Sequence, residues 1–179
     1  MSEQTVTQIK QLLATAEPAD LGPGPRAGVL SEATLKSELN SLLAETKLSS
    51  TRQQLVRSLV LLWHDHLDAS HTISQGIENS DGSFVHAIMH RREPDAWNSK
   101  YWWRRVGNHS AFSEIGRRVG ELLAREKLDL AKRLVPGGRW DASAFVDMCD
   151  SAKEESLIRT LREIQRIETE VLLEHFCHE

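Results

Sequence analysis

The residues best suited to chemistry gather in W-H-D-H-L-D-A-S-H, at positions 63–71, directly after the apolar run L-V-L-L at 59–62. On a continuous helix, side chains at i, i+4 and i+7 lie within about 40° of one another. His64, Asp68 and His71 have this spacing and continue the apolar face of the run, so we expect them to point into the protein. Asp65 falls on a different face and is expected to contact solvent.

The next predicted helix repeats the spacing in H-A-I-M-H-R-R-E, where His86, His90 and Glu93 again stand at i, i+4 and i+7. The turn N-S-D-G-S at 79–83 joins the two helices, which are therefore expected to pack as antiparallel neighbours. If the two stripes face each other, four histidines and two carboxylates surround one volume. Buried titratable groups must be paired, hydrogen-bonded or metal-bound, because an isolated charge in an apolar medium is very costly.

Imidazole and carboxylate together suit zinc, iron, manganese or nickel, and helical bundles commonly build metal sites from facing side chains. We therefore consider a divalent metal as a candidate cofactor. The candidate catalytic residues are His64, Asp68, His71, His86 and His90, and the candidate metal ligands are His64, His71, His86 and His90. The alternative is a polar core in which each histidine is satisfied by a neighbouring group.

Two known metal signatures are excluded. H-A-I-M-H lacks the glutamate that follows the first histidine in the H-E-x-x-H motif of zinc proteases. The His64-Asp65 dipeptide is similar to that of HD-type phosphohydrolases, but those proteins need a histidine well upstream, and His64 is the first histidine of this chain.

A block rich in arginine and tryptophan follows, R-R-E-P-D-A-W-N-S-K-Y-W-W-R-R-V-G-N-H at 91–109. Arginine binds carboxylates and phosphates with its planar fork, and tryptophan faces stack on arginines, sugars or bases. We expect this block to hold an anionic substrate group, and the candidate substrate-binding residues are Arg91, Asp95, Asn98, Trp103, Arg104 and Arg105. The alternatives are internal pairing of the arginines with carboxylates, tryptophans that fill the core, and helix-capping roles for Asp95 and Asn98.

The chain that must position these residues reads as a series of helices. Seven are expected after residue 31, over about 32–47, 51–76, 83–92, 97–106, 111–126, 141–152 and 154–176. We find no alternation of apolar and polar residues long enough for a sheet, and therefore predict an all-α, single-domain bundle of about seven helices. Residues 1–30 would supply an N-terminal helix and a Pro/Gly-rich linker, and residues 31–179 the helical domain. Gly116 and Gly120, four apart, are expected to allow close helix packing.

The composition of the 179 residues is that of an ordinary globular protein, with 40% hydrophobic and 27% charged residues. The net charge of -4 makes a nucleic-acid partner unlikely. No apolar run is long enough to cross a bilayer, the amino terminus lacks a signal peptide, and two cysteines cannot form a disulfide framework. We therefore expect a cytoplasmic protein with no membrane contact and a small-molecule ligand or substrate, and leave its oligomeric state open.

The stretch from W-H-D-H through H-R-R-E-P-D to W-R-R-V-G resembles an uncharacterised family of small helical proteins from bacteria and fungi. The resemblance covers about residues 60–110 and implies no activity, because none is known for that family. It does indicate that this block carries the function.

These observations favour a small-molecule enzyme, a metal-assisted hydrolase or isomerase acting on an anionic substrate. One alternative is a non-catalytic binding protein for an anionic or sugar-like ligand. The other is a structural or interaction protein whose polar core is satisfied internally.

Overall fold

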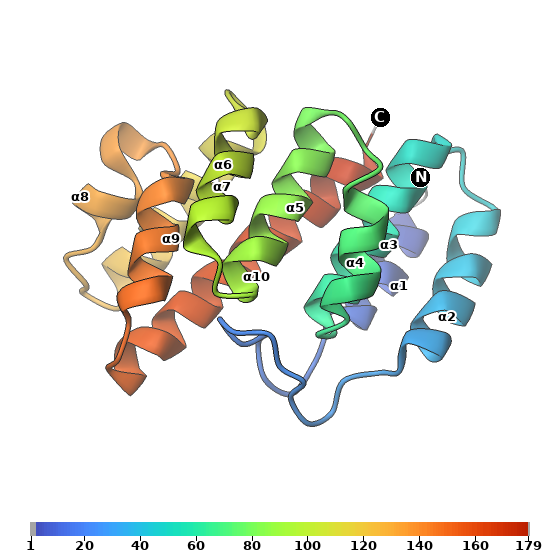
Figure 1. The fold of residues 1–179 in the computed structure, drawn as a ribbon, viewed down its shortest axis with the longest axis horizontal. Helices are drawn as coiled ribbons and strands as arrows, with labels where there is room; N and C mark the ends of the chain where they lie inside the picture. The colour runs from blue at the N-terminus through green and yellow to red at the C-terminus, as the bar shows by residue number, and fades with distance from the viewer. Residues whose placement is uncertain (1–2, 179) are drawn as a thin grey trace.

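The computed structural model describes residues 3–178, and over this range the chain forms only helices and loops (Figure 1). The all-α prediction is therefore confirmed. Ten α-helices and a short 3-10 turn are present between these residues instead of about seven helices. They are α1 (Glu3–Leu12), α2 (Glu32–Ala44), α3 (Ser50–Trp63), α4 (Leu67–Ser74), α5 (Ser80–Arg92), α6 (Ala96–Val106), α7 (Ala111–Arg125), α8 (Ala131–Leu134), η1 (Pro136–Gly138), α9 (Ala142–Ser151) and α10 (Glu155–Cys177).

The longest helix, α10, contributes a large part of the core. It packs against α1, α3 and α7 and crosses behind α5 in Figure 1. Its buried face is mostly apolar and includes Leu161, Ile164, Leu172 and Phe176. In front of it, α4 lies beside α3 and α5, and α5 lies beside α6. This order places the histidines of α4 and α5 on neighbouring helices.

Polar residues explain where five of the ten α-helices described begin. The side chains of Ser31, Ser49, Asn79, Asp95 and Asp141 each accept a hydrogen bond from a backbone N–H in the first turn of the helix that follows. Such caps satisfy donors that have no partner within the helix. The predicted starts near residues 32, 97 and 141 agree with these caps to within one residue.

The single helix predicted over 51–76 is wrong, because the chain breaks at residues 64–66. Helix α3 ends at Trp63 and α4 begins at Leu67. Between them Asp65 has a φ of 67°, in the left-handed region where a short polar side chain is better tolerated than most. The break also overturns the i, i+4, i+7 argument for His64, Asp68 and His71, since the three residues no longer lie on one helix.

The N-terminal segment is packed onto the helical domain. Ile9 of α1 and Ala19 of the following loop are buried in the same core as the other helices. The loop from 13 to 31 passes beneath α4 and α5 in Figure 1 before it reaches α2. Among residues 3–178, no helix is both long and apolar enough to cross a bilayer.

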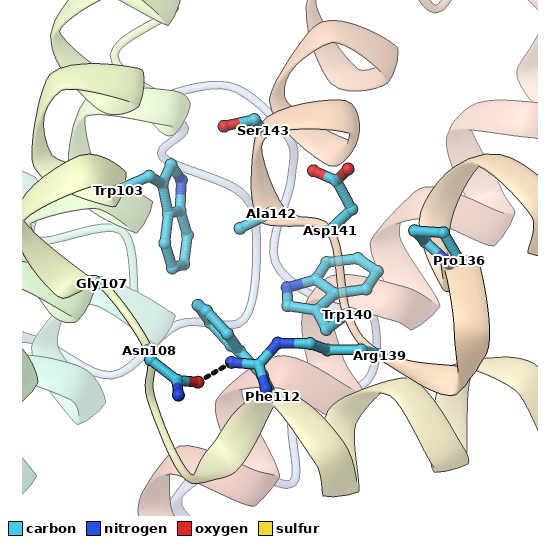
Figure 2. Close-up of a pocket in the computed structure, with 10 residues that line it drawn as sticks. All are labelled: Trp103, Gly107, Asn108, Phe112, Pro136, Arg139, Trp140, Asp141, Ala142 and Ser143. Atoms are coloured by element: carbon cyan, nitrogen blue, oxygen red, sulfur yellow. Dashed lines mark hydrogen bonds between the residues drawn. The ribbon is translucent and has the colours of Figure 1, made fainter.

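A pocket of about 610 Å³ opens where α6, α7, η1 and the start of α9 meet (Figure 2). Two loops form its rim, one after α6 and one before α9. It is separate from the histidines, since none of its lining residues is a histidine.

Candidate metal centre

Three histidines from two neighbouring helices come together at one place. His71 of α4 and His86 and His90 of α5 each offer a ring nitrogen, and these three atoms lie within 4.8 Å of one another. The ring centroids are 4.6 Å apart for His71–His86, 5.4 Å for His71–His90 and 4.8 Å for His86–His90. Nitrogen ligands of one tetrahedral zinc ion lie about 3.4 Å apart, so these nitrogens need to approach one another by at most about 1.4 Å to share an ion.

His86 has the least ordinary surroundings of the three. Its side chain is buried, its ring stacks on Trp102 of α6 at 3.9 Å, and its Nδ1 has no hydrogen-bond partner among residues 3–178. Burial, together with the nearby His90 and His71, lowers the pKa of His86 to about 3. The ring is therefore neutral at physiological pH, which is the state that binds a metal ion. A buried polar nitrogen without a partner is uncommon and requires an explanation.

His90 is held in place by polar neighbours. Its Nδ1 is 2.9 Å from Oε2 of Glu93, and its Nε2 is 3.1 Å from the amide nitrogen of Asn98. Burial lowers the pKa of His90, while the Glu93 carboxylate opposes that shift. A proton on Nδ1, donated to Glu93, leaves Nε2 deprotonated, and its lone pair accepts the hydrogen bond from the Asn98 side chain, a bond that a metal ion would replace. This is the arrangement in which a carboxylate orients a metal-binding histidine.

His64 lies outside the cluster. The Nδ1 atom accepts a hydrogen bond from the backbone N–H of Leu30 at 3.1 Å, and the Nε2 atom is 2.6 Å from the carbonyl oxygen of Leu12. Both ring nitrogens are therefore occupied by the N-terminal segment. His64 was a candidate ligand and catalytic residue because a continuous helix would have placed it above His71, and the break after Trp63 removes that relation.

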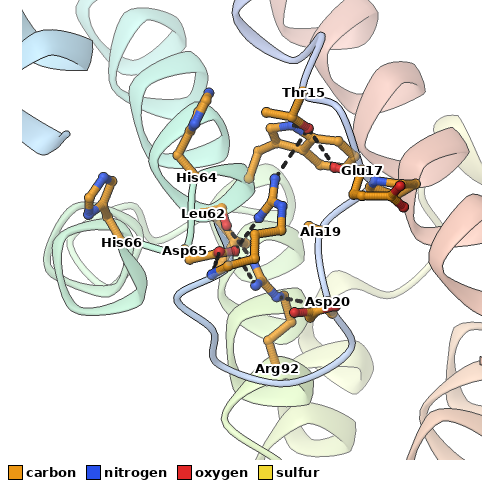
Figure 3. Close-up of polar contacts among 12 residues, drawn as sticks. Thr15, Glu17, Ala19, Asp20, Leu62, His64, Asp65, His66 and Arg92 are labelled. Carbon is orange, nitrogen blue, oxygen red and sulfur yellow. Dashed lines mark hydrogen bonds and ion pairs between the residues drawn. The ribbon is translucent and has the colours of Figure 1, made fainter. Parts of the chain in front are cut away.

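For both aspartates of the motif at 63–71, Asp65 and Asp68, the observed exposure is the opposite of the expected one. Asp68 is exposed instead of pointing inward. The Asp65 side chain, which was expected to contact solvent, is fully buried and forms ion pairs with Arg26 and Arg92. In Figure 3 Asp65 points toward Arg92 and the N-terminal loop, while His64 and His66 extend away from it.

Among the candidate substrate-binding residues, Arg91 already has internal partners. Its guanidinium is buried and pairs with Glu168 at 2.6 Å, donates to Gln165 at 3.1 Å and lies over the ring of Phe145 at 4.5 Å. Trp103 is also buried, 4.6 Å from the ring of Phe84, and lines the pocket of Figure 2.

Two candidate residues of the α6 region have local roles. The Asp95 carboxylate caps α6 by accepting from the N–H of Asn98 at 3.1 Å, and the Asn98 side chain contacts His90.

Arg104 and Arg105 are exposed, and neither has an ion-pair partner among residues 3–178. The Arg105 guanidinium lies 5.2 Å from the ring of Trp102, which in turn stacks on His86. One aromatic ring therefore separates this cation from the histidine cluster.

A second group of titratable residues was not foreseen. Asp81, in the first turn of α5, accepts from Nε2 of His109 at 2.8 Å and lies 3.0 Å from Nε2 of His175. Burial opposes ionisation of Asp81, but the bonds with His109 and His175 outweigh it, so its pKa lies well below the usual range. His109 and His175 are far from Asp81 in sequence and share no helix with it, so no spacing could have shown the group. It joins the start of α5, the loop before α7 and the end of α10.

No protein-family model, no curated protein sequence and no solved structure matches this chain. The chemistry of the histidine cluster is therefore inferred from its own geometry.

Proposed function

We propose that the protein is a metal-dependent enzyme, a hydrolase or isomerase of an anionic small molecule, with His71, His86 and His90 as the ligands of a divalent transition-metal ion. The observation that carries this proposal is the buried Nδ1 of His86, which has no hydrogen-bond partner in the described part of the chain, in a ring that has two further imidazoles beside it. A metal ion would give that nitrogen a partner, whereas a purely structural cluster leaves it unsatisfied.

The three-histidine arrangement suits catalysis more than structural metal binding. Structural zinc sites are closed by four protein ligands, whereas catalytic sites keep three and leave one position open. His71 is only half-buried, so the cluster reaches the surface at this side chain. An ion bound there would polarise a substrate oxygen or lower the pKa of a bound water. Glu93 would keep His90 in the tautomer with an unprotonated Nε2, and the ion would take the place of the Asn98 N–H at that nitrogen.

The charge on the α6 surface supports an anionic substrate. Arg104 and Arg105 are exposed cations that lack an ion-pair partner among the described residues, and Arg105 is positioned through Trp102. Arginine without an internal partner is suited to bind a carboxylate or phosphate group.

Metal analysis tests the proposal. Protein purified without a histidine tag is loaded with zinc, manganese or iron, and the bound metal is measured after dialysis. We expect about one ion per chain in the wild type and a loss of affinity of roughly 100-fold or more in His71→Ala. The matched control is His178→Ala, which removes an exposed histidine. Absence of bound metal under all loading conditions, or equal affinity of the two variants, contradicts the proposal.

An activity assay distinguishes the proposed enzyme from a second candidate, a binding protein that uses the same surface. The second candidate is favoured by the exposed Trp97, whose ring stacks with that of Tyr101 at 6.4 Å beside the two arginines. A set of 4-nitrophenyl esters and phosphates is incubated with metal-loaded protein. If the protein is an enzyme, we expect turnover that is lost in His71→Ala and on addition of a chelator. If it is a binding protein, we expect an anionic ligand to stabilise it against unfolding without turnover.

We further propose that the protein acts in the cytoplasm. Both of its cysteines, Cys149 and Cys177, are free thiols, and burial raises the pKa of the Cys149 thiol to about 12 and that of Cys177 to about 11. Unpaired, protonated thiols are compatible with a reducing compartment.

A further inference from the structure

The pocket of Figure 2 has aromatic walls. Trp103 of α6, Phe112 of α7 and Trp140 of the loop before α9 surround its interior, and their rings face the same space in the figure. The volume of about 610 Å³ is in the range that binds small molecules. Aromatic side chains at such a site favour a flat ligand, because ring faces stack on other planar groups.

One positive charge lies at the edge of these rings. The Arg139 side chain is exposed, and its guanidinium lies 5.3 Å from the ring of Phe112. It donates a hydrogen bond to the side-chain oxygen of Asn108, but no carboxylate among residues 3–178 pairs with it. Asn108 thereby fixes the guanidinium over the pocket while leaving its charge uncompensated. Such a cation attracts an anionic group.

The pocket also contains a hydrogen-bond donor without an acceptor. Trp103 is only 5% exposed, and its buried Nε1 atom has no hydrogen-bond partner within residues 3–178. Figure 2 shows this nitrogen on the edge of the ring that faces Ala142 and Ser143 at the start of α9. An indole N–H can only donate, so the group that would satisfy it is an acceptor.

The first turn of α9 adds further donors on the same side. Asp141 caps this ten-residue helix by accepting from the N–H of Ala144, and the hydroxyl of Ser143 lines the pocket. The Asp141 carboxylate is the one acidic group among the lining residues, and in Figure 2 it points away from Arg139 and Phe112. The positive end of a helix and a free hydroxyl both favour an acceptor or an anion nearby.

We propose that this pocket binds a small aromatic anion, a planar ring that carries a carboxylate or phosphate group. The ring lies among Trp103, Phe112 and Trp140. The anionic group binds the Arg139 guanidinium, and an acceptor atom of the ligand receives the Trp103 N–H. The site is distinct from the three-histidine cluster and does not depend on a bound metal.

Nuclear magnetic resonance of the five indole N–H groups tests the proposal. The protein is titrated with phenyl phosphate and with benzoate, and Trp103→Phe identifies the Trp103 signal. We expect the Trp103 and Trp140 signals to shift with at least one of these probes, while that of the exposed Trp97 stays in place. The tighter of the two probes shows whether the anion is a phosphate or a carboxylate. Inorganic phosphate, which has no ring, and benzyl alcohol, which has no charge, should each bind about tenfold more weakly or worse.

Arg139→Gln provides the decisive variant. Because Arg139 is exposed, the fold should be retained, and we expect the affinity for the aromatic anion to fall by about tenfold or more. Arg125→Gln makes the same change of charge at an exposed position outside the pocket and should bind like the wild type. The proposal is overturned if neither probe shifts the Trp103 signal at concentrations up to about 10 mM. It is also overturned if the two arginine variants bind equally well.

Discussion

At the scale of single residues, Asp65 determines how the N-terminal loop meets the helices. Its carboxylate, whose side chain is fully buried, receives Nη2 of Arg92 at 2.7 Å and the backbone N–H of Arg26 at 2.9 Å, and it also pairs with the Arg26 guanidinium (Figure 3). Gly24 approaches so closely that a Cβ there would lie 2.7 Å from the Asp65 carboxyl carbon. A single acidic side chain thus holds two arginines and a glycine turn.

Asp65→Asn should lower the free energy of unfolding by about 3 kcal/mol, because it leaves two largely buried guanidiniums without their counter-charge. Asp68→Asn makes the same chemical change three residues away at an exposed position and should alter it by less than about 0.5 kcal/mol. Urea denaturation of both variants measures the difference. Equal losses of unfolding free energy in the two variants would show that the buried ion pairs of Asp65 do not stabilise the fold.

At the scale of the elements, Gly116 allows α7 to pack against the turn before α9. A Cβ at this position would lie 2.6 Å from the carbonyl oxygen of Gly138 and 2.9 Å from the nitrogen of Trp140. At Gly120, one turn later, a Cβ would meet nothing within 4 Å. The expectation that both glycines allow close packing is therefore confirmed for Gly116 and wrong for Gly120.

Gly116→Ala should destabilise the protein by about 1–3 kcal/mol, since the backbone of the pocket rim must move to accept the methyl group. Gly120→Ala should stabilise it by up to about 1 kcal/mol, because alanine favours a helix where space is open. The thermal midpoints of the two variants should move in opposite directions. A shift of both in the same direction would contradict this account of α7.

The helices could be predicted from sequence wherever their limits depend on nearby residues. Ser31, Asp95 and Asp141 cap their helices through a backbone amide three residues ahead, so a short stretch of sequence contains the signal. The break at 64–66 depends on Arg26 and Arg92, which lie far from it in the chain. No local pattern shows that Asp65 is drawn into the interior, so the helix was predicted to continue.

The same distinction applies to the histidines. His86 and His90 lie on one uninterrupted helix, and their spacing correctly placed them side by side. His71 joins them because the turn before α5 folds α4 back against that helix. His64 was included only on the assumption of a continuous helix. The unpaired Nδ1 of His86 and the ring of Trp102 stacked on it could be seen only in three dimensions.

At the scale of the whole molecule, His64 makes the attachment of the N-terminal segment sensitive to acid. Burial lowers the pKa of His64 below its ordinary value of 6.5, although the bond with the Leu12 carbonyl partly opposes this shift. The neutral ring accepts from the Leu30 N–H, and a proton on that nitrogen would abolish the bond. Above about pH 6.5 the ring is neutral in both the folded and the unfolded chain. Below it the unfolded chain takes up the proton more readily, so the free energy of unfolding falls with falling pH.

We therefore expect His64→Phe to be less stable than the wild type near pH 8, but to lose less stability between about pH 7 and pH 5. The difference in slope should not exceed about 1.4 kcal/mol per pH unit, which is the effect of one proton. His178→Phe, at an exposed position, serves as the control and should keep the wild-type slope. His86 and His90 titrate in every variant, so the comparison isolates His64. Identical slopes for the two variants would contradict the role of His64.

The attachment of the loop has a consequence for how the protein is made. Arg92 donates to the backbone carbonyls of Asp20, Gly22 and Leu62, and Gln165 donates to those of Ala19 and Asp20. Residues 19–22 are therefore held by side chains translated much later, one of them on α10. Domains generally fold as units, and contacts distant in sequence form slowly. During synthesis the bonds from Gln165 form only after α10 is made, and until then residues 19–20 lack that attachment and are more open to chaperones and proteases.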